Sequence, residues 1–261
     1  MTMFIDLHCH LDHYLFESDI PIIISNARKA GIKHLVVSGI SPKSNRFALS
    51  LAQKFPEIVK ASIGLYPIDA LQNEILSSNV HKEILEFSVD SELEFIERNR
   101  RKIVALGEMG LDYKTGERKD DQKHLFIRQL ELAKRLRKPV IIHSRHAEED
   151  VLDILGGYKL NVVLHCFSGN KRLVKRASDL GYYFTIPTHV VRSQQFQDII
   201  RAVPLSQLFC ETDSPYLSPF ANRRNEPAFV VESYKKIAEI KGTTLLETGH
   251  SIYMNWQRVF E

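Results

Sequence analysis

Six side chains that can bind a metal ion stand at the ends of five short apolar segments of this chain. Imidazole nitrogens suit zinc, manganese, iron or cobalt, whereas carboxylate oxygens suit magnesium and manganese. Four imidazoles and two carboxylates can surround two divalent cations if one carboxylate bridges the ions. Such a pair can lower the pKa of a water molecule and neutralise charge on a leaving group, which is the chemistry of a metallohydrolase. The six residues are His8, His10, Glu108, His143, His165 and Asp213.

The apolar segments that end in these residues belong to a series of eight predicted strands. Segments with helical periodicity lie between the strands, and in residues 120–137, for example, Leu125, Leu132 and Leu136 fall on one helical face. Strands that alternate with helices imply parallel βαβ units. The predicted strands span residues 3–8, 33–38, 59–64, 102–108, 138–143, 161–165, 182–186 and 207–211.

Eight βα units in 261 residues predict an α/β fold, a single (β/α)8 TIM barrel that forms one domain over residues 1–261. A terminal helix is predicted over residues 243–260. No G-x-G-x-x-G sequence opens the first turn, which argues against a dinucleotide-binding fold. Side chains alternate along a strand, so His8 and His10 share one face and Cys9 points to the other. Because a TIM barrel builds its active site at the C-terminal ends of its strands, the six candidate ligands are expected to converge there.

The composition limits the classes of function. The net charge is +3, from 35 basic and 32 acidic residues, and so small a charge does not by itself indicate nucleic-acid binding. No apolar run is long enough to cross a bilayer, and the N-terminal residues lack the pattern of a secretion signal. We therefore predict a cytoplasmic protein without membrane association. The three cysteines, Cys9, Cys166 and Cys210, contain no C-x-x-C pair, and we expect them to be reduced and buried.

Several longer motifs resemble those of the TatD-related metal-dependent deoxyribonuclease family, and they occur in family order along nearly the whole chain. They are FIDLHCHLD, GEMGLDY, PVIIHSRHAEED, HCFSG, ETDSPYLSP and RRNEP. The resemblance implies a barrel related to the amidohydrolases, two divalent metal cations (Mg, Mn or Zn) and cleavage of phosphodiester bonds. It also implies that His8 and His10 bind the first ion. His143 and His165 would bind the second, with Glu108 as the bridge.

The resemblance also names candidate catalytic residues and shows one departure from the family. Asp213 would bind the first ion and accept a proton from the attacking water, and it would act together with Glu108. The family usually has G-x-H-P after the third strand, but residues 64–67 of this chain read GLYP. A phenol with a pKa near 10 can donate a hydrogen bond but is a poor base at neutral pH. We expect Tyr66 to contact the substrate, and His189 could replace part of the missing imidazole.

Charge and position predict further substrate contacts. Arg145 follows His143 by two residues, and Arg223, Arg224 and Asn225 lie in the loop after the eighth predicted strand. Arginine makes bidentate contacts to phosphate. We therefore expect these residues to bind the phosphates of the substrate.

The sequence leaves three classes of function open. We favour a metal-dependent hydrolase that cleaves the phosphodiester bonds of DNA, as an exonuclease on single strands or damaged ends, in DNA repair or turnover. The first alternative is a hydrolase of C–N bonds or carboxylic esters, including an aminoacyl-tRNA deacylase, because such enzymes share the barrel and the metals. The second is a metal-stabilised binding protein without catalysis. No obligate protein partner is indicated.

Overall fold

The computed structural model describes residues 3–71 and 87–261. Its centre is one sheet of eight parallel strands, in which each strand pairs with the next along the chain. This order confirms the predicted TIM barrel, and each of the eight predicted strands overlaps an observed one. The strands are β1 (Phe4–Cys9), β2 (Ile32–Gly39), β3 (Val59–Ile63), β4 (Ala105–Asp112), β5 (Val140–Arg145), β6 (Val162–Leu164), β7 (Tyr183–Pro187) and β8 (Leu208–Glu211).

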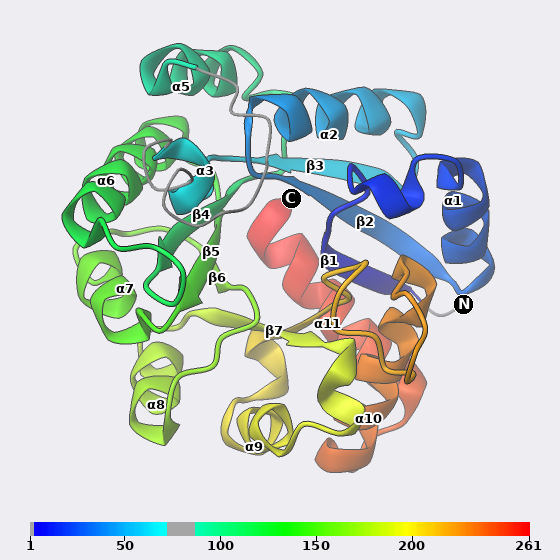
Figure 1. Ribbon diagram of the computed structural model, residues 1–261. Coiled ribbons are helices and arrows are strands. Elements are labelled where there is room, and N and C mark those ends of the chain that lie inside the picture. Colours follow the sequence, from blue (N-terminus) through cyan, green and yellow to red (C-terminus); the bar gives the residue numbers. More distant parts are fainter. Residues whose placement is uncertain (1–2, 72–86) are drawn as a thin grey trace.

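Helices surround the strands (Figure 1). Their apolar faces pack on the sheet. Side-chain N-caps mark the start of some of them; Ser41, for example, forms a capping box with Ser44 at the start of α2, and Thr244 forms one with Glu247 at the start of α11. The predicted helix over 120–137 is α6. The α-helices are α1 (Ile20–Lys29), α2 (Pro42–Lys54), α3 (Pro67–Ala70), α5 (Val89–Arg98), α6 (Lys119–Leu136), α7 (Glu148–Leu155), α8 (Lys171–Asp179), α9 (Gln194–Ala202), α10 (Val231–Lys241) and α11 (Leu245–Phe260). The described residues also contain four short 3₁₀ helices, η1 (Tyr14–Phe16), η2 (Thr188–Val191), η3 (Leu205–Gln207) and η4 (Pro227–Val230).

The barrel closes where the end of β1 meets the segment that follows β8. Cys9 and Ser214 form a parallel bridge. The amide of Asp213 donates to the carbonyl of His8 at 2.9 Å, and the amide of His10 donates to the carbonyl of Ser214 at 2.8 Å. We call residues 8–10 and 212–214 the seam. The seam fixes the backbones of three of the six candidate ligands relative to one another.

The terminal helix α11 lies across the N-terminal end of the barrel (Figure 1). Trp256 is 2% exposed and stacks on His34, near the start of β2, with 4.6 Å between ring centroids. The amide of Asn255 donates to the carbonyls of Leu205 and Leu208, each at 2.9 Å. This end of the barrel is therefore packed, and the ligand-bearing C-terminal end forms the other face. Within the described residues, no helix combines the length and apolar character needed to cross a membrane.

Strand β4 differs from its predicted range of 102–108. It begins at Ala105 and continues to Asp112, so Glu108 lies inside the strand and does not close it. The pairing with β5 changes register between Leu106 and Met109. Gly110 has a positive φ, and a Cβ there would come 2.0 Å from the carbonyl oxygen of His143, so the two backbones approach as only glycine allows. Such irregularities redirect side chains beside active sites.

Candidate metal centre

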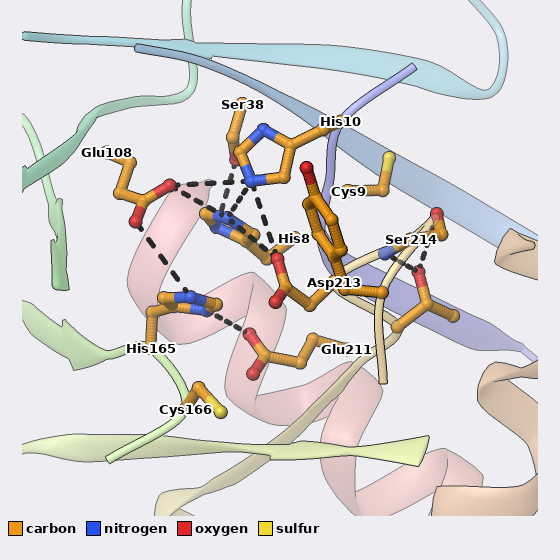
Figure 2. Close-up of polar contacts among 12 residues, drawn as sticks. His8, Cys9, His10, Ser38, Glu108, His165, Cys166, Glu211, Asp213 and Ser214 are labelled. Atoms are coloured by element: carbon orange, nitrogen blue, oxygen red, sulfur yellow. Dashed lines mark hydrogen bonds and ion pairs between the residues drawn. The ribbon is translucent and has the colours of Figure 1, made fainter. Parts of the chain in front are cut away.

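Glu108 lies between two pairs of imidazoles, and Figure 2 shows three of these rings, those of His8, His10 and His165. Its Oε2 atom is 3.2 Å from Nε2 of His8 and 3.5 Å from Nε2 of His10. Its Oε1 atom is 2.9 Å from Nδ1 of His143 and 4.0 Å from Nε2 of His165. Each carboxylate oxygen therefore faces one histidine pair. Two three-residue groups that could each hold a cation share this one carboxylate.

Asp213 joins the half of the site that contains the first two histidines. Its Oδ1 atom lies 3.4 Å from Nε2 of His10 and 3.7 Å from Nε2 of His8. The seam holds the Asp213 backbone, in a left-handed conformation with φ of 54°, against the end of β1. The structure thus brings together all six residues that the sequence singles out as ligands.

The electrostatics of the site suit cations. Burial alone would raise the pKa of Glu108, but the neighbouring His8 and His143 outweigh burial and hold that pKa well below its usual value. Burial likewise opposes ionisation of Asp213, and a hydrogen bond from His10 overcomes it, so the pKa of Asp213 is lowered as well. Both carboxylates are therefore charged at neutral pH.

Before a metal ion binds, protonated histidines supply the positive charge, since the pKa is raised at His10, His143 and His165. Burial lowers the pKa of His10, but the carboxylates of Asp213 and Glu108 outweigh it and raise that pKa to about 9. Burial also lowers the pKa of His165, but the carboxylate of Glu211 outweighs it and raises that pKa to about 10. These protons must leave before the imidazoles can bind metal ions. The donor set of four imidazoles and two ionised carboxylates fits a pair of divalent cations.

Partners behind the ligands orient two of the imidazoles. Oγ of Ser38 lies 3.0 Å from Nδ1 of His8, so Nε2 of that ring faces Glu108. Oε2 of Glu211 lies 2.7 Å from Nδ1 of His165, which likewise presents Nε2 to the site (Figure 2). His8, His165 and Glu211 also form a group that could hold a cation. Because Glu211 contacts the far nitrogen of His165, we assign it to orientation, the usual place of a carboxylate behind a metal-binding histidine.

His143 has a corresponding support that the sequence reasoning missed. Its Nε2 atom lies 3.4 Å from Oδ2 of Asp112 and 3.3 Å from the hydroxyl of Tyr66. The Tyr66 hydroxyl also donates to Oδ2 of Asp112 at 2.5 Å. Tyr66 is thus tied to the second histidine pair as well as to the cavity. Asp112 follows Glu108 by four residues in GEMGLD, and this even spacing along one strand was the available signal.

A cavity of about 960 Å³ opens above the carboxylates. Of the predicted substrate contacts, Tyr66 and Arg145 line it, and so does His189. The Arg145 side chain is exposed and makes no hydrogen bond or ion pair within the described ranges. It is therefore available to a substrate anion. The remaining lining includes Ile40, Ile68, Lys114, Thr115, Ser144, Cys166, Ser168, Gln195, Phe196, Tyr216 and Leu217.

Three predicted phosphate contacts do not line the cavity. Asn225 is fully buried, and its amide donates to Thr188, to the Thr212 carbonyl and to the Tyr216 carbonyl. Arg224 pairs with Asp19 at 3.0 Å and donates to the carbonyl of Leu15. Arg223 is exposed, and its guanidinium lies over the Phe229 ring at 4.3 Å. Asn225 and Arg224 both hold loops together, and their predicted binding of phosphate stays a prediction.

The cysteines divide into two kinds. Cys9 and Cys210 are buried as expected, and Sγ of Cys9 donates to the carbonyl of Val36, on the side away from the carboxylates. Cys166 was also expected to be buried, but it is partly exposed and lines the cavity. It has a positive φ of 44° just after β6, which ends its alternation with His165.

Comparisons with known proteins show the family of this chain. The family described as TatD related DNase matches residues 5–261. Human deoxyribonuclease TATDN3 is 34% identical over 266 residues, which cover 98% of this chain and 94% of that protein. The uncharacterized metal-dependent hydrolase YabD of Bacillus subtilis is 30% identical over 266 residues, and 99% of each chain is covered. The structure of YJJV, a TatD homolog from Escherichia coli, has a TM-score of 0.84 at 28% identity and covers 98% of this chain and 97% of that one.

Fold and site together define a TIM-barrel metal-dependent hydrolase. The chain belongs to the TatD-related DNase family, as its motifs predicted.

Proposed function

We propose that this hydrolase binds two divalent cations and cleaves phosphodiester bonds of DNA. The observation that carries the proposal is the placement of Glu108, whose two oxygens face two separate histidine pairs. One carboxylate in this position can serve two ions. The names of the human and mouse relatives as deoxyribonucleases support DNA as the substrate.

The side chains of the site would have different roles in hydrolysis. His8, His10 and Asp213 would hold one ion, and His143 and His165 the other. When bound, a pair of divalent ions supplies an acidified water and neutralises charge on the phosphate. Asp213 is ionised at neutral pH, since its pKa is lowered, and it lies at the edge of the cavity. We assign it the role of proton acceptor for the attacking water.

The cavity supports a strand end as the substrate. His8 is fully buried and Glu108 is 4% exposed, so the reacting phosphate must enter deeply to reach them. A terminal nucleotide can do this without unpairing an internal stretch of duplex. Arg145 is placed to bind the phosphate as it enters. We therefore propose exonuclease action on single strands or damaged ends, with a role in DNA repair or turnover.

The test is a cleavage assay on reconstituted protein. Metal-stripped enzyme is loaded with Mg, Mn or Zn and given end-labelled single-stranded and duplex DNA, beside an ester panel and an amide panel that includes aminoacyl-tRNA. With at least one of these metals, we expect the DNA to be shortened progressively from one of its two ends. The Glu108→Gln protein, purified identically, controls for contaminating nuclease.

Each contrary result selects another function. Activity on esters or amides with none on DNA would assign the site to the amidohydrolase-type alternative. Metal binding without turnover on any substrate would leave the non-catalytic binding protein. Release of internal fragments would replace the exonuclease by an endonuclease.

A further inference from the structure

An exposed aromatic cluster borders the metal centre at the seam. Tyr14 is 74% exposed and Tyr216 is 53% exposed. The ring of His13 joins them, with its centroid 4.4 Å from Tyr14 and 5.6 Å from Tyr216. The cluster combines the segment after β1 with the segment after β8, the two elements that meet at the seam (Figure 1).

Two further observations separate this cluster from ordinary surface tyrosines. Nine large hydrophobic side chains are exposed among the described residues, and four of them lie on these two segments: Tyr14, Leu15, Tyr216 and Phe220. A concentration of exposed apolar side chains beside a candidate active site indicates a surface that binds a ligand. Tyr216 also lines the cavity that contains Glu108 and Asp213, so the cluster continues the proposed active site.

The cluster is held in place by its backbone. The Tyr216 amide donates to the Asp213 carbonyl at 2.9 Å, and the Tyr216 carbonyl accepts from Asn225 at 2.7 Å. His13 caps η1 by accepting from the Leu15 amide at 3.3 Å. Arg224 joins the two segments through its hydrogen bond to the Leu15 carbonyl. The two segments that carry the rings are thus held in place.

We propose that His13, Tyr14 and Tyr216 form an aromatic shelf on which single-stranded nucleic acid stacks the base next to its scissile phosphate. The inference rests on the proposed phosphodiesterase function, and it adds the surface that selects an unpaired base. Stacking on aromatic side chains requires a base released from its duplex neighbours and tolerates any sequence.

Charge supports a nucleic acid as the occupant of the shelf. Arg223 lies beside the exposed Phe220 ring, with 5.6 Å between guanidinium and centroid, and has no carboxylate partner in the described ranges. Arg145 is the corresponding free cation inside the cavity. Exposed aromatic rings with interspersed cations are what a single strand needs, because rings contact bases and cations contact phosphates. The shelf therefore gives Arg223 a phosphate to bind outside the cavity.

The test measures binding without cleavage. Fluorescence anisotropy, measured in the presence of a chelator, gives the Kd of the protein for two labelled single strands. One strand is normal, and in the other the last two nucleotides at each end are tetrahydrofuran abasic sites. We expect the abasic strand to bind at least about five-fold more weakly. The Tyr14→Leu/Tyr216→Leu protein keeps apolar volume but loses both tyrosine rings and retains only His13, and its preference for the normal strand should fall to about two-fold or less. Tyr158→Leu, at a half-buried tyrosine after α7, should keep the preference.

The outcomes distinguish the shelf from the proposed chemistry. Equal binding of both strands by the unsubstituted protein, or an unchanged preference in the double variant, would overturn the shelf. Retained preference in chelator, with no cleavage after metal is restored, would keep the shelf and reject the phosphodiesterase. A thermal melt of each variant identifies loss of fold.

Discussion

Glu108 contacts both histidine pairs, so its substitution should affect both ions. Glu108→Gln keeps the shape of the side chain and removes its charge. We expect metal content to fall from two ions to one or none, measured by elemental analysis, and turnover to fall below detection. Glu239→Gln, at an exposed residue of α10 paired with Lys236, is the matched control. Full metal content with normal turnover in Glu108→Gln would remove Glu108 from the site.

Asp213 should separate binding of metal from chemistry. Asp213→Asn retains an oxygen toward His8 and His10 but loses the basic carboxylate. We expect it to keep more metal than Glu108→Gln while its kcat falls by about 10²- to 10⁴-fold, the usual contribution of a general base. Metal analysis and steady-state kinetics on the same sample make the comparison. A rate within a few-fold of the unsubstituted enzyme would contradict the role as proton acceptor.

Tyr66 supports His143 through its hydroxyl, and removal of that hydroxyl should weaken one ion only. For Tyr66→Phe we expect about 10- to 100-fold weaker binding of the second ion, since partners behind a metal ligand contribute on this scale. Calorimetric titration of metal-stripped protein should show one unchanged and one weakened binding event. Tyr158→Phe serves as the control. If both metal-binding events were unchanged, Tyr66 would have no role in metal binding, and only its contact with the substrate would remain.

At the scale of elements, the loops after β5 and β8 differ in what their arginines do. Arg145→Ala should raise KM for DNA and make its salt dependence shallower, with unchanged metal content, because a free cation in the cavity is lost. Arg224→Ala should instead lower the melting temperature and leave KM nearly unchanged, because Arg224 ties the β8 loop to Asp19 and Leu15. If Arg145→Ala instead lowered the melting temperature and Arg224→Ala raised KM, Arg224 would be the residue that binds substrate and Arg145 the one that stabilises a loop.

The elements show which parts of the site a sequence can reveal. Periodicity predicted all eight strands, and ligand-type residues at or near the ends of five of them singled out the six candidate ligands, because parallel strands end at one face. The supports behind the ligands were harder to find. Ser38 reaches His8 from a neighbouring strand, and that contact depends on register. Asn225 was predicted to contact phosphate from its place in the loop after β8. Only the tertiary structure shows that its amide donates hydrogen bonds to Thr188, Thr212 and Tyr216.

At the scale of the whole molecule, stability should depend on pH in opposite ways with and without metal. Without bound metal, the carboxylates around His10 and His165 raise their pKa values to about 9 and about 10. Their contribution to folding is complete below about pH 6.5, the value for an unfolded chain, and is lost as pH rises through 9 and 10. Metal ions compete with these protons, so their contribution grows over the same range.

The measurement is a set of thermal melts between pH 6.5 and 8.5, with chelator and with MgCl₂ or MnCl₂. We expect the rise in melting temperature on addition of metal to increase with pH. The His10→Gln/His165→Gln protein should show a smaller and flatter rise. A rise that is constant or decreasing with pH in the unsubstituted protein would contradict proton–metal competition at these residues.

The seam also determines when during synthesis the enzyme can become active. Asp6 accepts hydrogen bonds from the amide and hydroxyl of Thr212, a residue made 206 positions later. A chain emerging from the ribosome presents His8 and His10 early but has no Asp213 and no seam to hold it. Such a chain cannot yet hydrolyse its substrate, and a fragment that stops before the seam stays inert. The first and last of the candidate ligands therefore come together only when the barrel is complete.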